Sequence, residues 1–242
     1  MADEDNPKKI VTKKDGPFEV YGNIPLVRKI QIVSEYGEPL TWQKQETIET
    51  DGAYYLCRCG RSTEKPFCSG YHRHTDFNGT ETASNAPIST RQDVFPGQNI
   101  LLKRVYSLCM DAGFCGNRVT DIGKMIHQTD DTIVRAQLMA MIERCPSGSL
   151  TYSIDENSAD IEPDLPQQIA VTTEITSDGP IDGPLWVTGN IPIERADGKL
   201  LEIRNRVTLC NCGLSREKPF CDGQHREEAE RKAHGHLVTG SS

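Results

Sequence analysis

The chain alternates short apolar or β-branched runs with polar turn residues. Such runs occur as FEVYGN at 18–23, RKIQIVSE at 28–35 and AYYLC at 53–57, and again as LWVTGN at 185–190 and LEIRNRVTLC at 201–210. Glycine, proline, asparagine and aspartate interrupt them, and period-two alternation between such breaks is typical of β-strands. We therefore expect a small antiparallel β module towards each end of the chain.

The middle of the chain has a helical pattern instead. In DDTIVRAQLMAMIER at 130–144, apolar residues recur at spacings close to 3.6, which predicts a helix with one buried face. The polar pair Thr129–Asp130 is its candidate N-cap. The residues that we expect to pack in the core, and not to bind a cofactor, are Ile133, Val134, Leu138, Met141 and Ile142.

The two ends of the chain repeat each other. GPFEVYGNIPLVR at 16–28 matches GPLWVTGNIPIER at 183–195, and each leads to the spacing Cys-x-Cys-x8-Cys-x3-His. The offset is 167 residues between 16 and 183 but 153 between Cys57 and Cys210, so the first copy has 14 extra residues, which we expect to form a hairpin. Modules of roughly 55 residues often need a metal or a partner to be stable. We therefore predict an intramolecular pseudo-dimer whose copies exchange strands or share a sheet.

The acidic stretch ENSADIEPDLPQQ at 156–168 separates the second copy from the rest. It contains two prolines and no apolar periodicity, so we interpret it as a linker. The chain then divides into a first module at 1–76, a central segment at 77–160 and a second module at 161–242. The predicted fold class is α+β, with two small β-rich modules around a central α/β insert.

Composition narrows the partners and the compartment. The 242 residues have a net charge of −8 and no Lys/Arg-rich run, which argues against nucleic acid or an anionic membrane as partner. MADEDNPKKI at 1–10 lacks the basic start and apolar run of a secretory signal, and no stretch approaches the ~20 apolar residues of a membrane span. We expect a cytoplasmic protein with a protein partner.

Nine cysteines in a reducing compartment favour metal ligation over disulfides. They form three local triplets with none left over, which predicts three metal centres. The triplets are Cys57, Cys59 and Cys68; Cys109, Cys115 and Cys145; and Cys210, Cys212 and Cys221.

In each repeat the candidate ligands form two pairs. Cys57 and Cys59 are two apart and can chelate one metal from an extended turn. Cys68 and His72 are four apart and share one face if a helical turn begins at the third cysteine. Two pairs that each serve one iron make a 2Fe-2S site, but three cysteines and one histidine are equally a structural zinc set. The second copy has the same pairs at Cys210, Cys212, Cys221 and His225.

Both ligand strings resemble the CDGSH iron-sulfur family, the mitoNEET-like proteins. CNCGLSREKPFCDGQH at 210–225 has that family's Cys-x-Cys, its Ser/Thr and its Pro-x-Cys-Asp-Gly-x-His. CRCGRSTEKPFCSGYH at 57–72 differs in having Ser69 where the second copy has Asp222, although both residue types can cap a helix. The resemblance implies a 2Fe-2S cluster on three cysteines and one histidine in each copy. It also implies that the Cys-His pair binds the outer iron and that the histidine lies near solvent.

The middle triplet has a different spacing. A bacterial-type ferredoxin has a cysteine in the middle of its first group and a remote Cys-Pro. This chain has Ala112 at the first of these places, between Cys109 and Cys115, and a Cys145–Pro146 pair at the second. Three thiolates suffice for a 3Fe-4S cluster, which lacks the fourth iron. Three buried free cysteines in an α/β module are the alternative.

This segment also resembles a known family, the divergent mono-cluster ferredoxins. Its CPSGSLTYSID resembles their CPxGxL ending. The likeness implies a ferredoxin-like insert that binds a 3Fe-4S cluster through the middle triplet. A 4Fe-4S cluster remains open, with Asp111, His127 or water as the fourth ligand.

The chain has no P-loop, dinucleotide fingerprint or nucleophile elbow. The clusters are therefore the expected chemistry, and we predict an electron carrier with a redox protein as partner and without a substrate site. Two alternatives stay open. One is a store or donor that passes 2Fe-2S units to apo-iron-sulfur proteins, and the other is a protein with structural zinc.

Replacing His225 with cysteine tests the ligand prediction. In His225→Cys the added thiolate charge should make the second cluster harder to reduce, and the loss of a titratable ligand should make it less acid-labile. Redox titration and the rate of colour loss at mildly acidic pH measure the two effects. Unchanged potential and unchanged acid lability would count against His225 as a ligand.

Overall fold

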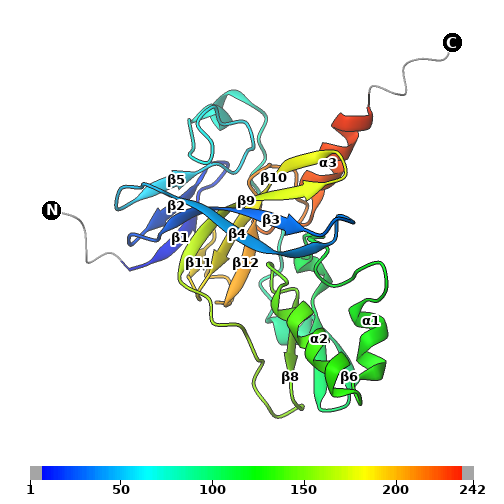
Figure 1. Cartoon of the computed structure of the whole chain (residues 1–242). Coiled ribbons are helices and arrows are strands. Elements are labelled where there is room, and N and C mark those ends of the chain that lie inside the picture. The colour runs from blue at the N-terminus through cyan, green and yellow to red at the C-terminus, as the bar shows by residue number, and fades with distance from the viewer. Residues whose placement is uncertain (1–6, 236–242) are drawn as a thin grey trace.

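The strands form three sheets in this computed structural model, which describes residues 7–235 (Figure 1). The first sheet has the order β11 (Ile193–Glu194), β1 (Lys9–Thr12), β2 (Phe18–Tyr21) and β5 (Tyr54–Leu56). The second has the order β12 (Arg206–Leu209), β10 (Gly179–Thr188), β9 (Gln168–Thr176), β3 (Leu26–Val33) and β4 (Pro39–Ile48). The third, in the central segment, has the order β6 (Asp93–Gly97), β7 (Ile100–Arg104) and β8 (Leu150–Ser153).

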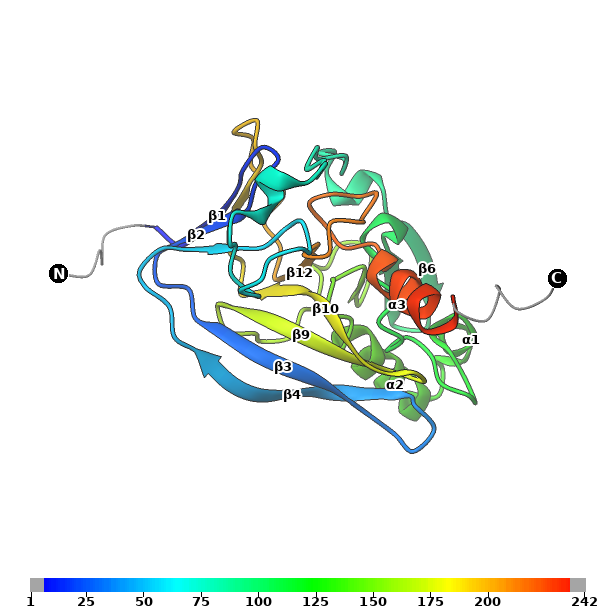
Figure 2. The ribbon, with the colours of Figure 1, turned by 90° about the horizontal axis from the view of Figure 1, so that it is seen from above.

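The chain has few helices and is a mixed fold made mostly of strands. This content agrees with the predicted α+β class. The α-helices of the described residues are α1 (Ile122–Met125), α2 (Thr132–Glu143) and α3 (Gln224–His234). Short 3₁₀ turns lie at Tyr71–His74, Ile88–Thr90, Tyr106–Leu108 and Ile126–Gln128. Figure 2 shows α3 beside β10, on the side away from β4. Within residues 7–235, no helix has the length and apolar character needed to cross a membrane.

Two parallel strand pairs join the copies, and they are equivalent to each other. β1 of the first copy pairs with β11 of the second, with Ile10 opposite Ile193. β9 of the second copy pairs with β3 of the first, with Ile169 opposite Leu26. Leu26 and Ile193 are matching positions of the repeat. Each copy therefore supplies a strand to a sheet of the other. The sequence predicted antiparallel modules that exchange strands or share a sheet, but it did not predict parallel pairing between the copies.

One apolar core lies under both sheets and draws on both copies. Phe18 and Val20 of the first copy are buried in the same cluster as Leu185 and Val187 of the second. Burying one such side chain contributes roughly 1.5–3 kcal/mol. Separating the copies would expose this shared core to water. The central segment has a second core of its own, between its sheet and the helices α1 and α2.

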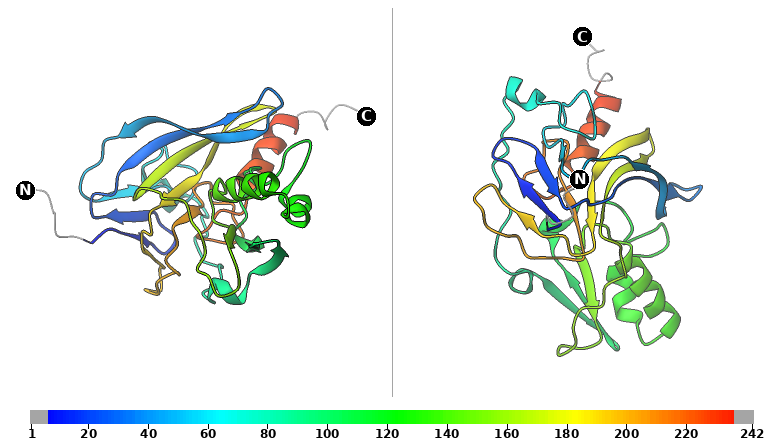
Figure 3. Two further views of the ribbon diagram at one scale, coloured as in Figure 1. Left: turned by 60° about the horizontal axis from the view of Figure 1, so that its bottom comes forward. Right: turned by 90° about the vertical axis from the view of Figure 1, so that its left-hand side faces the viewer.

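The extra residues of the first copy form a hairpin, as predicted. β3 and β4 pair antiparallel along their length, from Leu26 opposite Ile48 to Val33 opposite Pro39. This long blue hairpin forms the outer edge of the second sheet in Figure 3. It places Trp42 against Trp186 of β10, with 5.9 Å between the ring centroids.

The second copy has an insertion of its own, which the sequence comparison missed. In the first copy Thr12 lies opposite Phe18, and in the second Val171 lies opposite Leu185. Phe18 and Leu185 are matching positions, so the short turn 13–15 corresponds to the hairpin end 172–182. The outer halves of β9 and β10 form this extension, so β10 begins at Gly179, before the run LWVTGN at 185–190.

Two other boundaries differ from the sequence prediction. Only Arg206–Leu209 of the run at 201–210 is a strand. The helix α2 is confirmed, but its N-cap is Asp131 and not Thr129–Asp130, because the Asp131 side chain accepts the N–H of Ile133 at 2.7 Å. Ile133 is 67% exposed in the first turn, so the prediction that it belongs to the core is wrong. Leu138, Met141 and Ile142 are buried as predicted.

The linker has no helix or strand over 156–167, as expected, but it is tied to the second copy. Glu162 forms an ion pair at 2.9 Å with the buried Arg206, and the carbonyl of Pro166 accepts the hydroxyl of Thr188 at 2.6 Å. Most of the N-terminal stretch MADEDNPKKI, on which the expectation about targeting rested, lies outside the described residues.

Cutting the linker tests the exchange of strands. A protease site inserted between Glu156 and Asp160 should yield two fragments that still co-elute on size exclusion, because β1–β11 and β3–β9 pair across the cut. The uncut insertion variant is the control. Fragments that separate without denaturant would contradict a shared core.

Candidate metal centres

The two ligand loops are held by the same hydrogen bonds. Cys57 donates its N–H to the carbonyl of Pro66 at 2.9 Å, and Ser62 donates its hydroxyl to the carbonyl of Phe67 at 2.6 Å. These bonds bring the Cys-x-Cys end of the motif beside the Pro-x-Cys end. The second copy repeats both, at 2.9 and 2.7 Å, between Cys210 and Pro219 and between Ser215 and Phe220.

Within each loop the candidate ligands come together as two pairs. The sulfurs of Cys57 and Cys59 are 3.7 Å apart, and the sulfur of Cys68 is 3.4 Å from Nδ1 of His72. The second copy has the same two distances, between Cys210 and Cys212 and between Cys221 and His225. In the part of the chain that the structure describes, no three His, Cys, Asp or Glu side chains converge closely enough to hold one metal ion. Each pair can bind one iron of a two-iron cluster, and three cysteines with one histidine are also a ligand set for one tetrahedral zinc.

The helical turn that carries each histidine begins later than predicted. Its N-cap is Gly70 in the first copy and Gly223 in the second, with φ of 79° and 91°, a left-handed conformation that favours glycine. The turn therefore does not begin at the third cysteine. The prediction that Ser69 or Asp222 occupies the N-cap is also wrong.

Ser69 and Asp222 instead brace the loop. The carboxylate of Asp222 accepts the N–H of Arg216 at 2.8 Å, and the hydroxyl of Ser69 accepts the N–H of Thr63 at 3.3 Å. Hydrogen bonds to a charged acceptor are shorter and stronger. The first copy keeps this contact in a weaker form.

The two histidines differ in exposure. His72 is partly exposed and lines an open surface pocket of about 920 Å³, together with Cys68, Lys13 and Lys14. Desolvation lowers the pKa of His72, and the positive charges nearby add to this, so the neutral form that binds metals is favoured. His225 is only 6% exposed, so the implied position near solvent is wrong for the second copy.

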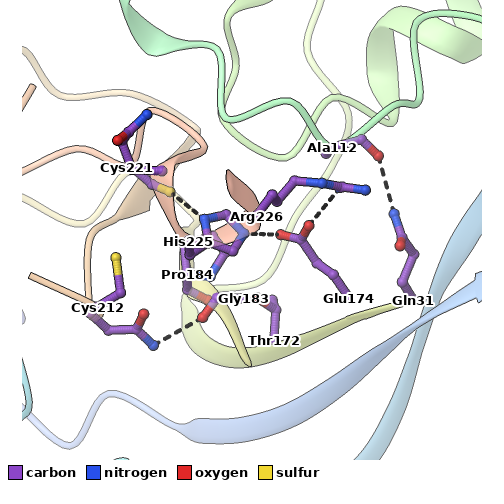
Figure 4. A network of polar contacts seen from close by, with 12 residues as sticks. Gln31, Ala112, Thr172, Glu174, Gly183, Pro184, Cys212, Cys221, His225 and Arg226 are labelled. Carbon is purple, nitrogen blue, oxygen red and sulfur yellow. Dashed lines mark hydrogen bonds and ion pairs between the residues drawn. The ribbon is translucent and has the colours of Figure 1, made fainter. Parts of the chain in front are cut away.

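His225 is held by a buried carboxylate (Figure 4). Its Nε2 lies 2.9 Å from Oε1 of Glu174, whose other oxygen accepts from Arg226 at 2.7 Å. Glu174 itself has no exposed surface. The contact leaves Nδ1 of His225 facing the sulfur of Cys221.

Burial also affects the thiols. It raises the pKa of Cys221 and of Cys115, whereas a hydrogen bond from Cys212 lowers the pKa of Cys210 to about 6. The raised pKa values keep Cys221 and Cys115 protonated at neutral pH in the metal-free chain. Metal binding at these residues therefore releases protons.

The first and second loops touch at their Cys-x-Cys ends. A Cβ on Gly60 would lie 2.4 Å from the carbonyl oxygen of Cys212, and one on Gly213 would lie 2.9 Å from that of Cys59. Both glycines have positive φ. Only glycine at both positions allows the backbones of the two ligand loops to approach this closely.

A buried arginine belongs to the first of these loops. Arg58 stands between the first two cysteines of the chain and donates to the carbonyls of Lys13 at 2.7 Å and Gly79 at 2.9 Å. Desolvation lowers its pKa, while nearby negative groups, including the thiolate of Cys210, act in the opposite direction. A guanidinium of the first loop therefore provides positive charge near Cys210 of the second.

The three middle cysteines surround one small cavity. Cys109, Cys115 and Cys145 line a space of about 60 Å³, together with the loop from Met110 to Phe114. Asp111 also lines it, with φ of 60°. His127 is exposed and does not line it, so of the two suggested fourth ligands only Asp111 is at the site.

The middle loop packs directly on the second site. Met110, Ala112 and Phe114 form a buried cluster with Cys221, and Trp42 packs against its edge. The same three residues line the cavity of the middle cysteines. One layer of side chains therefore separates the second site from the middle one. In Figure 1 the loop after β5, which belongs to the first site, lies at the opposite end of the molecule from the central segment.

Sequence reasoning missed the residues that surround the ligands. Glu174 lies in the insertion 172–182, which has no counterpart in the first copy, so the repeat contained no signal for it. Gln31 was also missed. It donates to the carbonyl of Ala112 at 3.1 Å (Figure 4). It also accepts the N–H of Ile175 at 3.1 Å, and so links the strands β3 and β9 to the middle loop.

Comparisons with known proteins agree with both resemblances. Residues 15–73 and 182–226 each match the family described as iron-binding zinc finger, CDGSH type. Residues 95–155 match the family described as divergent 4Fe-4S mono-cluster. No curated protein and no solved structure gave a significant match to the chain.

The contact between the loops predicts unequal effects of two glycine substitutions. Gly60→Ala combines a positive φ with a Cβ 2.4 Å from a carbonyl oxygen, whereas Gly198→Ala has the same kind of backbone, φ 80°, and nothing within 4 Å. The strained backbone alone costs about 1–3 kcal/mol. Chemical denaturation should therefore show a clearly larger loss of unfolding free energy for Gly60→Ala than for the control, and equal losses would contradict the close approach.

Proposed function

We propose that this chain, which has two regions that match the CDGSH type around a central region that matches the divergent 4Fe-4S mono-cluster family, carries electrons through three iron-sulfur clusters. The proposed cofactors are two 2Fe-2S clusters and one 3Fe-4S or 4Fe-4S cluster. Clusters of these kinds supply one-electron chemistry. The proposed ligands are Cys57, Cys59, Cys68 and His72; Cys109, Cys115 and Cys145; and Cys210, Cys212, Cys221 and His225.

The paired ligands support iron-sulfur clusters over structural zinc. In both repeats the distances of 3.7 and 3.4 Å join two ligands each, which gives one pair for each iron of a 2Fe-2S cluster. All nine cysteines are free thiols, so none is used in a disulfide. This favours a reducing compartment, and we propose the cytoplasm.

The order of the three ligand sets carries the proposal of electron transfer. The backbone of Cys212 touches the first loop at Gly60, and Cys221 touches the middle loop at Met110 and Phe114. The second site thus lies between the other two. The second centre is buried and has a more accessible centre on each side. This is the arrangement expected of a centre that passes electrons between two others.

The chain's own residues contribute burial, charge and fixed ligand positions. The buried side chains of Met110, Ala112 and Phe114 exclude water from the space between the second and the middle site. Arg58 of the first repeat provides positive charge near Cys210 of the second. Fixed charges and low exposure are the means by which a protein sets a cluster's potential.

We also propose an intramolecular pseudo-dimer of the two copies, supported by the equivalent pairs β1–β11 and β3–β9. The proposed domains are 1–76, 77–160 and 161–242. The redox or apo-iron-sulfur protein partner would approach from outside this unit. We propose neither a substrate site nor contact with nucleic acid or membrane.

A second function, donation of 2Fe-2S units to apo-proteins, is favoured by one observation. Cys68 and His72 of the first site line an open pocket, so a partner's thiols can reach them. Reversible reduction with the iron retained favours the carrier. Loss of colour to an apo-ferredoxin favours the donor.

Electron paramagnetic resonance (EPR) with iron and sulfide analysis tests the cluster content. The anaerobically purified protein should contain iron and sulfide, with 2Fe-2S signals only after reduction and a signal from the middle centre that appears when oxidised for 3Fe-4S and when reduced for 4Fe-4S. A colourless protein that contains zinc would contradict the proposal.

The middle centre has its own test in Cys145→Ser. This variant should lose the signal of the middle cluster and keep both 2Fe-2S signals, because Cys145 lines only the middle cavity. Retention of every wild-type signal would rule out the middle cluster.

A further inference from the structure

Glu174 is a fully buried carboxylate with both oxygens in use. Oε1 lies 2.9 Å from Nε2 of His225, and Oε2 accepts from the guanidinium of Arg226 at 2.7 Å (Figure 4). Burying a carboxylate is unfavourable unless it is paired. The partners of Glu174 are the proposed cluster ligand His225 and the next residue, Arg226. The position of Glu174 is therefore linked to the second site.

The backbone around Glu174 is fixed on several sides. A Cβ on Gly183 would lie 3.0 Å from Oε1 of Glu174 and 2.4 Å from the hydroxyl of Thr172, so glycine at 183 leaves room for the carboxylate. Thr172 donates that hydroxyl to the carbonyl of Pro184 at 2.6 Å. Ile175 donates its N–H to Gln31 at 3.1 Å. The strand that carries the carboxylate is therefore also held by contacts outside the ligand loop.

This contact determines which nitrogen of His225 is available. When Nε2 donates its proton to Glu174, Nδ1 is left with the lone pair, and Nδ1 is the nitrogen 3.4 Å from the sulfur of Cys221. A carboxylate that accepts the outer proton of a ligand histidine fixes the ring and makes it a stronger donor to the metal. It also adds negative charge beside the site.

The first copy has the arginine but not the carboxylate. Arg73 follows His72 as Arg226 follows His225, but the short turn 13–15 replaces the hairpin that carries Glu174. Among the described residues no side chain forms a hydrogen bond with Nε2 of His72, which lies 3.9 Å from the Cβ position of Gly16 and beside the open pocket.

We propose that Glu174 is a positioning residue that holds His225 on the second cluster, so that the second centre is retained while the first, without such a residue, is the one that exchanges its cluster. The inference deepens the proposed function and rests on its assignment of His72 and His225 as ligands. It assigns different roles to the two similar motifs. The first stores or exchanges its cluster, and the second keeps its cluster and relays electrons.

The test uses two full-length backgrounds that each keep one repeat site. Cys68→Ser leaves the second site, and Cys221→Ser leaves the first. Glu174→Gln, which removes the charge but keeps the shape, is placed in each background, and Asp178→Asn on the same hairpin serves as the control. The readouts are the rate of 2Fe-2S loss to a ferrous-iron chelator and the reduction potential of the remaining 2Fe-2S centre, both followed by EPR.

In the Cys68→Ser background, Glu174→Gln should speed the loss of the second cluster about 10-fold or more. It should also raise that centre's potential, because a negative charge is removed. Asp178→Asn should change neither, and Glu174→Gln should change neither in the Cys221→Ser background. An unchanged loss rate and potential at the second site would overturn the inference while leaving electron transfer intact.

A comparison that needs no change at Glu174 covers the case in which Glu174→Gln fails to fold. The first site, alone in Cys221→Ser, should lose its cluster faster than the second site, alone in Cys68→Ser. Equal rates, or slower loss from the first site, would overturn the inference. Absence of iron and sulfide from both backgrounds would instead overturn the proposed function, and this inference with it.

Discussion

The exchange of strands between the two copies is the constraint on which the rest of the structure depends. β11 of the second copy pairs with β1 in the sheet of the first, and β3 of the first copy pairs with β9 in the sheet of the second, so neither copy completes its sheet alone. The shared core that results turns the two Cys-x-Cys ends towards each other, where Gly60 and Gly213 allow backbone contact. The closeness of the first and second sites therefore follows from the pairing of strands that carry none of the candidate ligands.

The second site occupies the central place because two insertions meet on it. The hairpin β3–β4 of the first copy supplies Trp42 and Gln31, which contact the middle loop at Phe114 and Ala112. The outer part of β9 and β10 supplies Glu174. An internal repeat usually suggests two equal sites, but here each copy's own insertion packs around the second site, and the first remains open.

The sequence was sufficient for the features that local spacing determines. The ligand pairs, the β3–β4 hairpin and the helix α2 follow from residue spacing and hydrophobic period, and they occur where expected. The Ser69 and Asp222 caps were mispredicted because both side chains bond across their loop to residues six positions earlier. Glu174 could not be predicted, since its partners are 51 and 52 residues away and a buried acid has no local signature. The parallel pairing of the copies is likewise a long-range property.

The central claim is that the second centre lies between the first and the middle one. Pulsed EPR of the reduced protein measures the dipolar coupling between pairs of paramagnetic centres, and variants that lack one site allow each pair to be assigned. We predict strong coupling for the first–second and second–middle pairs and the weakest coupling for the first–middle pair. A first–middle coupling as strong as either of the others would contradict this order.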